Sequence, residues 1–129
     1  MHNISSPDAS DSAIEREIKA KGKTAPRITP ADVEAHIIGE HYFIAGDAIA
    51  QTAENYIETE HRVGPLFLLT FCVLVLRNGF TVTGESACAS PENFDPEIGR
   101  KIARANAVNK VWPLLGYALR DELFSNSNI

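Results

Sequence analysis

The sequence lacks a long apolar run, and only 2 of its 129 residues are cysteines. Its longest apolar stretch, Leu66–Leu76, has Thr70 as its one polar member and about half of the roughly 20 residues that a transmembrane helix needs. There is no apolar core of a secretory signal, and two cysteines are too few for a disulfide scaffold. These absences predict a soluble, cytosolic protein with free thiols.

Positive charge is also scarce, because 12 lysines and arginines stand against 17 acids and the net charge is −5. This balance argues against a general nucleic-acid binder. A chain of 129 residues with 44% hydrophobic residues can form one domain with a real core. We expect a flexible N-terminal arm at 1–27, a single domain at 28–124 and a frayed tail at 125–129.

No motif for catalysis or metal binding is complete. The order of His36, Glu40 and His41 matches neither of the zinc-binding histidine–glutamate patterns. The segment Gly84–Cys88 loosely resembles a nucleophile elbow, but it lacks the second glycine and no histidine follows it. A Walker-type phosphate loop and a G-x-G-x-x-G motif are both missing. The sequence therefore predicts a protein that is not an enzyme and that holds no metal and no cofactor.

The densest signal that is present lies in Leu66–Phe94, where an apolar run is followed by Asn78-Gly79 and then by alternating residues. Asn-Gly between two β-favouring runs is the strongest short hairpin signal, because both residues can adopt positive φ. A two-residue turn would place Val75 opposite Val82. We expect strands at about 66–77 and 80–88. The first is apolar on both faces, which predicts a central strand that is covered twice.

Helix starts can be recognised on both sides of this hairpin. Thr29–Asp32 offers an N-cap, a proline in the first turn and an acid at the positive end of the helix dipole. That helix is expected to reach Gly39 or a few residues beyond, and Tyr42–Ala45 fits either an edge strand or a last turn. Further helices are expected over Ser12–Lys21 and Asp47–His61.

The second start, Asp95–Glu97, repeats the same cap, proline and acid. From Ile98 to Leu123, apolar residues recur every three or four positions, which predicts a long helix. Pro113 should kink or break it. The predicted fold is α+β, with the hairpin in a small sheet that is packed by N-terminal helices and by a long C-terminal helix kinked near Pro113.

The start of this long helix is positively charged, although the chain as a whole is negative. It contains four cations without an acid between them, namely Arg100, Lys101, Arg104 and Lys110. Arg100 and Arg104 are four residues apart, so they repel each other on one face near the positive end of the dipole. Two interpretations stay open. Either neighbouring carboxylates neutralise the cations, or an anionic ligand such as a phosphate does so.

The stretch from about Leu69 to Leu123 carries the string C-hydrophobic-NGF-GES-C-NFD-GRKIA-A-W-GY-L. It resembles the small tailed-phage protein family named after gene products 49 and 66, and the upstream segment Ile18–Thr29 fits the N-terminal region of that family. The resemblance covers most of the chain. The family name carries no biochemical function.

The hairpin and the NFD-helix block are also similar to the Thoeris anti-defence sponge proteins, which bind cyclic ADP-ribose-type immune signals and cyclic oligonucleotides without cleaving them. That resemblance implies a homo-oligomer, a dimer or an assembly of dimers, with ligand pockets at subunit boundaries. It implies Phe80 as a base platform, Asn93 and Asp95 as polar contacts, and Arg100 and Arg104 as phosphate contacts.

The leading functional hypothesis is thus a phage protein of the host bacterial cytoplasm that sequesters a cyclic nucleotide-type immune signal, with no nucleic acid or membrane as partner. The alternative is a protein–protein adaptor or host-takeover factor. It would use the acidic surface predicted for Asp32–Glu60 to bind a basic host protein.

Overall fold

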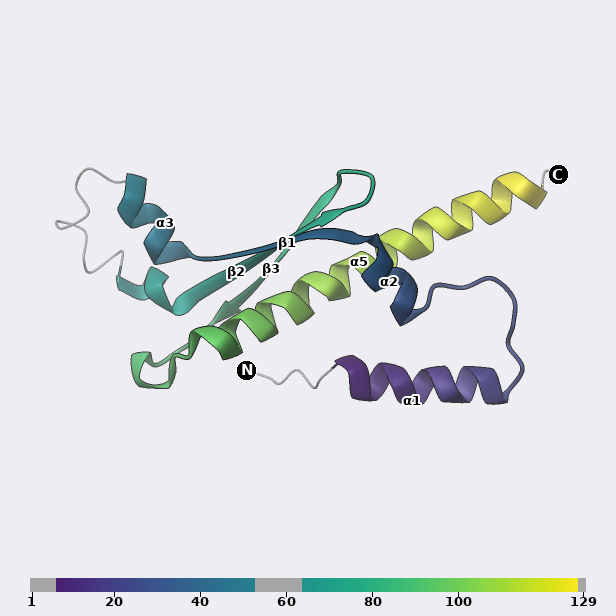
Figure 1. Cartoon of the computed structure of the whole chain (residues 1–129), viewed down its shortest axis with the longest axis horizontal. Coiled ribbons are helices and arrows are strands. Elements are labelled where there is room, and N and C mark those ends of the chain that lie inside the picture. Colours follow the sequence, from purple (N-terminus) through teal and green to yellow (C-terminus); the bar gives the residue numbers. More distant parts are fainter. Residues whose placement is uncertain (1–6, 53–63, 128–129) are drawn as a thin grey trace.

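The computed structural model describes residues 7–52 and 64–127. In that part, three antiparallel strands form one sheet in the order β1-β2-β3, and a long helix lies across it (Figure 1). The α+β fold class is therefore confirmed, with β2 as the central strand. The elements are α1 (Pro7–Ala20), α2 (Pro30–His36), β1 (Ile37–Ile44), α3 (Ala45–Thr52), the 3₁₀ turn η2 (Gly64–Leu68), β2 (Leu69–Leu76), β3 (Thr81–Ala87), the 3₁₀ turn η3 (Pro91–Asn93) and α5 (Pro96–Ser127).

The β2–β3 hairpin forms as predicted, but its register differs by one residue. Leu74 lies opposite Val82, and Val75 lies opposite Thr81. The amide of Gly79 donates to the carbonyl of Leu76 at 2.8 Å, and Gly79 has φ 91°. The loop thus has three residues with glycine in the left-handed position, a common alternative to the two-residue Asn-Gly turn. The expected pairing of Val75 with Val82 is wrong for this reason.

This one-residue shift decides which face of β2 meets the core, because neighbouring side chains point to opposite faces. Thr70, Cys72, Leu74 and Leu76 are buried, whereas the residues between them are only half buried. Cys72, Leu74 and Leu76 pack with Val33 of α2 and with alanines and valines of α5. Within the described residues, β2 is therefore central, but only one of its faces is fully covered. The predicted double cover is not found.

Helix α5 approaches the sheet closely at Gly84 of β3. A Cβ atom at Gly84 would overlap the backbone nitrogen of Ala107 and the backbone oxygen of Ala103. Ala103 and Ala107 are completely buried and lie one turn apart on the same side of α5. The small residues on both elements thus allow backbone to pack against backbone.

The first strand replaces the end of a predicted helix. Helix α2 stops at His36, and β1 continues through Ile44 as an edge strand that pairs with β2. The expected extension of the helix to Gly39 is therefore wrong, because pairing with β2 outweighs the helical spacing of the isoleucines. Of the two alternatives for Tyr42–Ala45, the edge strand is confirmed as far as Ile44, and Ala45 begins α3. Helix α3 covers the start of the helix predicted for Asp47–His61, whose remainder lies outside the described residues.

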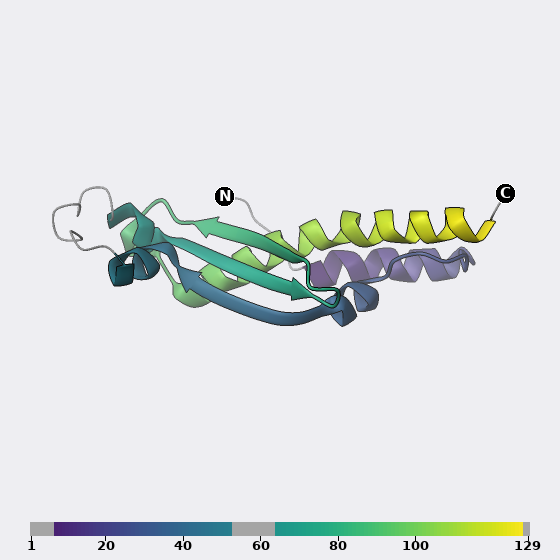
Figure 2. The same cartoon turned by 90° about the horizontal axis from the view of Figure 1, so that it is seen from above.

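The two terminal helices are longer than the sequence suggested. Helix α5 is continuous through Pro113 and ends at Ser127, inside the expected tail. Figure 2 shows it changing direction between its green and yellow halves, as a proline kink would produce. Helix α1 begins at Pro7 rather than Ser12. It is tied to the segment before α2 by two hydrogen bonds from Arg27 to Glu15, at 2.6 and 2.9 Å.

A buried hydroxyl on β2 gives a first testable prediction. The Oγ1 atom of Thr70 is buried and has no hydrogen-bond partner among the described residues. An unsatisfied buried polar group costs about 1–3 kcal/mol. We therefore expect Thr70→Val to raise the free energy of unfolding by about 1 kcal/mol, measured by urea denaturation. Thr83→Val, at an exposed position of β3, is the matched control, and an equal gain there would contradict the explanation.

Candidate functional site

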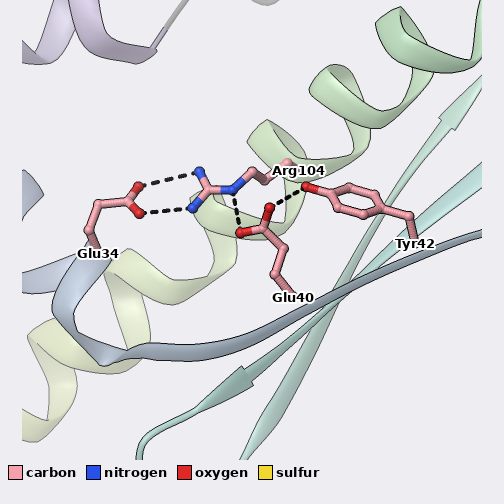
Figure 3. Close-up of polar contacts among 4 residues, drawn as sticks. All are labelled: Glu34, Glu40, Tyr42 and Arg104. Atoms are coloured by element: carbon pink, nitrogen blue, oxygen red, sulfur yellow. Dashed lines mark hydrogen bonds and ion pairs between the residues drawn. The ribbon is translucent and has the colours of Figure 1, made fainter.

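The cationic start of α5 meets carboxylates from two other elements at Arg104 (Figure 3). Its Nε donates to Oε1 of Glu40 at 2.9 Å. Its Nη2 and Nη1 donate to the two carboxylate oxygens of Glu34 at 2.8 and 3.3 Å. The hydroxyl of Tyr42 donates to Oε2 of Glu40 at 2.6 Å. One guanidinium is thus shared by two carboxylates, one of which is held in place by a phenol.

Local structure explains how these side chains meet. Glu34 lies on α2, whose start is fixed by a capping box in which Thr29 and Asp32 each accept a hydrogen bond from the backbone amide of the other. Glu40 and Tyr42 are two residues apart on β1, so both point to the same face of the sheet. That face is the one that α5 covers. The network therefore joins α2, β1 and α5.

The titration of the network follows from these contacts. The hydrogen bond with Glu34 raises the pKa of Arg104 further above its usual range. Burial alone would raise the pKa of Glu40, but hydrogen bonds from Tyr42 and Arg104 outweigh it and hold that pKa below its usual range. Burial, and then the bond to Glu40, raise the pKa of Tyr42. At neutral pH, Arg104 and Glu40 are thus both charged, and Tyr42 is protonated.

Neutralisation by carboxylates, one of the two open interpretations, applies to some residues of the cation cluster but not to all of them. The protein's own carboxylates neutralise Arg104, and Glu97 approaches Lys101 at 3.5 Å. Arg100 is exposed and has no carboxylate partner in the described part of the chain. The acidity of the 32–60 segment was visible in the sequence. What could not be seen was that α2 and β1 direct two of its acids at Arg104.

The structure does not bring the five predicted ligand residues together. Oδ1 of Asp95 accepts hydrogen bonds from the amides of Glu97 and Ile98, at 2.9 and 3.2 Å, and so serves as the helix cap. Asn93 is exposed at the end of η3, close to Asp95 in the chain. Phe80 is 55% exposed at the hairpin tip. All of β3 lies between it and Asn93, so the two belong to opposite ends of the sheet.

Phe80 lies instead in a cleft between the hairpin tip, the end of α2 and the C-terminal half of α5. The cleft has a volume of about 550 Å³ and contains an aromatic, a cationic, an imidazole and an amide side chain above aliphatic ones. No carboxylate is found among its described lining residues. These residues are His36, Leu76, Arg77, Asn78, Phe80, Leu114, Leu115 and Ala118.

Backbone contacts orient the polar groups of this cleft. Nη2 of Arg77 donates to the carbonyl of Ala35 at 2.9 Å. Nδ1 of His36 lies 2.8 Å from the carbonyl oxygen of Asp32, and because a carbonyl only accepts, Nδ1 carries a proton. The Nε2 atom can then accept a hydrogen bond, or donate one if the ring is charged. Sequence reasoning found Phe80 but missed His36 and Arg77, since only the fold brings them beside it.

Residues 7–52 and 64–127 contain neither a candidate metal site nor a candidate membrane span. No group of three or more histidine, cysteine, aspartate or glutamate residues there is arranged to hold a metal ion. No helix in that part is long and apolar enough to cross a membrane. Cys72 and Cys88 are free thiols, as predicted, with Cys72 buried and Cys88 half buried.

The fold and the cleft together define a small α+β protein in which an antiparallel three-stranded sheet is backed by one long helix. Residues 28–123 match the phage protein (N4 Gp49/phage Sf6 gene 66) family, and the chain belongs to that family. The first predicted resemblance is therefore confirmed. No match was found among curated proteins or among solved structures. The resemblance to the Thoeris anti-defence sponge proteins thus gains no support and stays a prediction.

Proposed function

We propose that this phage protein binds a nucleotide-type anion, a cyclic nucleotide immune signal, in the cleft beside Phe80 and sequesters it in the host cytoplasm without cleaving it. The observation that carries the proposal is the composition of the cleft. In a chain with 17 acids against 12 lysines and arginines, its described lining has a cation, an imidazole and an aromatic ring but no carboxylate.

The cleft suits such a ligand in size and chemistry. Small-molecule sites usually measure about 300–1,000 Å³ and combine an apolar lining with a few polar groups, and this cleft falls in that range. Phe80 offers an exposed ring on which a base can stack, a contact worth about 1–3 kcal/mol. Arg77 can donate charge-assisted hydrogen bonds to phosphate oxygens, and the imidazole of His36 lies beside it in the same cleft. Stacking and phosphate contacts are therefore available side by side.

The other four predicted contact residues do not line this cleft. Asp95 caps α5, and Arg104 is held by Glu34 and Glu40, so neither is needed in the cleft. Asn93 and Arg100 stay proposed contacts only for an oligomer that brings them to the cleft of a second subunit. Sequestration needs no nucleophile, metal or redox centre. We therefore propose a binding protein rather than an enzyme.

Replacing Phe80 by alanine tests the cleft directly. Loss of one stacking contact should weaken ligand binding by about tenfold to a hundredfold. Affinity would be measured by calorimetry against a panel of cyclic ADP-ribose isomers and cyclic di- and trinucleotides. Phe43→Ala, which also removes a partly exposed ring but from β1, should bind as the wild type does. Absence of binding across the whole panel would refute the proposal, and release of altered ligand on denaturation would instead identify an enzyme.

The alternative function is a protein–protein adaptor, and one observation favours it. Phe43 of β1 is 43% exposed and stacks on Phe71 of β2 across the face of the sheet that α5 does not cover. Exposed apolar patches often mark protein contacts. The acidic surface is a weaker candidate than the sequence suggested, since Glu34 and Glu40 are engaged with Arg104. Capture of a stoichiometric host protein, with no small molecule retained, would favour this function.

A further inference from the structure

Strand β1 forms an open edge of the sheet. It pairs with β2 on one side only, and Figure 2 shows no described strand along its other side. The one irregularity in its register lies between Ile37 and Gly39, so residues 40–44 form a regular strand. These five residues include no proline and no lysine, the two residue types that commonly protect an edge strand from further pairing.

The hydrogen-bond pattern of the sheet shows which backbone groups of β1 point outward. The amide and the carbonyl of Leu76 both bond within the hairpin, so every second residue of β2 is directed at β3 and the residues between them at β1. Val73 is one of those directed at β1, and it lies opposite His41. Glu40 and Tyr42, on either side of His41, therefore direct their N–H and C=O groups away from β2. Among residues 7–52 and 64–127, no partner outside the sheet bonds to these four groups.

The opposite edge of the sheet is covered by the protein itself. The carbonyl of Glu85 on β3 accepts a hydrogen bond from Nδ2 of Asn106 at 2.8 Å. Helix α5 also packs backbone to backbone against β3 at Gly84. Its own helix thus occupies part of the β3 edge, and β1 is the edge that is available to a further strand.

The side chains beside the β1 edge differ between the two faces of the sheet. On the face that α5 covers, Glu34 and Glu40 share the guanidinium of Arg104 (Figure 3), so two carboxylates are matched by one cation. The other arginine of this helix start, Arg100, pairs with neither acid. The side chain of Glu34 stays 56% exposed. On the other face, Phe43 offers a partly exposed ring. A strand beside β1 would therefore meet acids on one face and an aromatic ring on the other.

We propose that β1 accepts an extended segment of another protein as a fourth, antiparallel strand. Its side chains alternate between basic, on the face of Glu40, and apolar, on the face of Phe43. The outward groups of Glu40 and Tyr42 are two residues apart, which is the spacing of the hydrogen-bonded pairs between antiparallel strands. In such strand addition, main-chain bonds supply the affinity and alternate side chains supply the specificity.

The charges favour a basic segment over a second copy of β1 as the occupant. Two copies side by side would bring two acid-rich networks together, and like charges across an interface oppose association. A lysine or arginine next to Glu40 would instead balance the carboxylate that Arg104 leaves unmatched. This interaction is independent of nucleotide binding in the cleft beside Phe80.

A blocked octapeptide of alternating valine and lysine is the probe for this edge. Titrated to about 1 mM into the isotope-labelled full chain, it should shift the backbone amide signals of Glu40 and Tyr42 and slow their hydrogen exchange. Methyl groups on the lysine amides should abolish binding, because these donors face β1. Methyl groups on the valine amides, which face away, should leave binding unchanged. An octapeptide of alternating valine and glutamate should not bind.

Glu34→Gln tests the charge without altering the backbone of β1. Exposed ion pairs are weak, so this variant should bind the valine–lysine peptide about twofold to fivefold less tightly. Glu92→Gln, at an exposed position of η3, is the matched control and should bind it as the wild type does. The peptide should leave nucleotide affinity unaltered, so that either proposal can fail alone.

Three results would overturn the assignment of the β1 edge to a basic strand. The first is no binding of the valine–lysine peptide at about 1 mM, or equal binding after methylation of its lysine amides. The second is a set of signal changes centred on the cleft beside Phe80 instead of on Glu40 and Tyr42. The third is self-association of the free chain that already protects these two amides, which would assign the edge to a second copy.

Discussion

Gly84→Ala should lower the free energy of unfolding by about 3 kcal/mol or more, although it adds a single methyl group. The new Cβ atom would overlap backbone atoms of Ala103 and Ala107 rather than the flexible end of a side chain. No rotamer change can relieve such an overlap, so α5 would have to move off β3. That movement would open the core formed by Leu74, Val82 and their neighbours. Urea denaturation followed by circular dichroism measures the change.

Gly116→Ala is the matched control for this substitution. It makes the same chemical change in α5, but its Cβ atom would meet nothing within 4 Å. Alanine is favoured over glycine in a helix by about 0.8–1.0 kcal/mol, so this variant should be more stable than the wild type. Opposite signs for the two glycines are the expected result. A Gly84→Ala variant as stable as the wild type would show that the close approach of α5 and β3 does not limit stability.

The hairpin shows how much of this fold the sequence could predict. Apolar runs, alternation and Asn78-Gly79 predicted its strands, because these are local signals. They did not fix the register, since Asn-Gly is compatible with both a two-residue and a three-residue loop. The choice between them depends on packing, because only the observed register places Gly84 opposite Cys72 and under α5. The predicted pairing failed where a long-range contact outweighed a local preference.

The candidate site shows the same limit more strongly. Phe80 was singled out from its place in a motif, but His36 and Arg77 belong to elements that meet only after α2 and the hairpin tip have packed together. For Arg104, the sequence showed a cation near the start of a helix and an earlier acidic segment, whose residues Glu34 and Glu40 lie 70 and 64 residues before it. It could not show that the alternation of β1 would direct Glu40 and Tyr42 toward that cation. The sequence thus shows which charged residues are available, but only the fold shows which of them form ion pairs.

Arg104→Glu should lower the free energy of unfolding at pH 7 by about 2–3 kcal/mol. It removes the guanidinium shared by Glu34 and Glu40 and places a third carboxylate between them. Breaking a buried ion pair costs about 3–5 kcal/mol, and the Arg104 side chain is 29% exposed, so a smaller loss is expected. Arg100→Glu is the matched control: it reverses an exposed, unpaired cation one turn earlier and should change stability by less than about 0.5 kcal/mol.

The pH dependence of this loss identifies its cause. The pKa of Glu40 is held low in the folded wild type, so the stabilisation from its contacts is fully present above the ordinary carboxyl range. It is lost as the pH falls through the lowered folded-state value. In the variant, crowded carboxylates raise each other's pKa, so protonation relieves the repulsion. The difference between wild type and variant in urea denaturation should therefore be large at pH 7 and should shrink as the pH falls below the ordinary carboxyl range. A normally stable Arg104→Glu protein that had lost ligand affinity would instead assign Arg104 to phosphate binding.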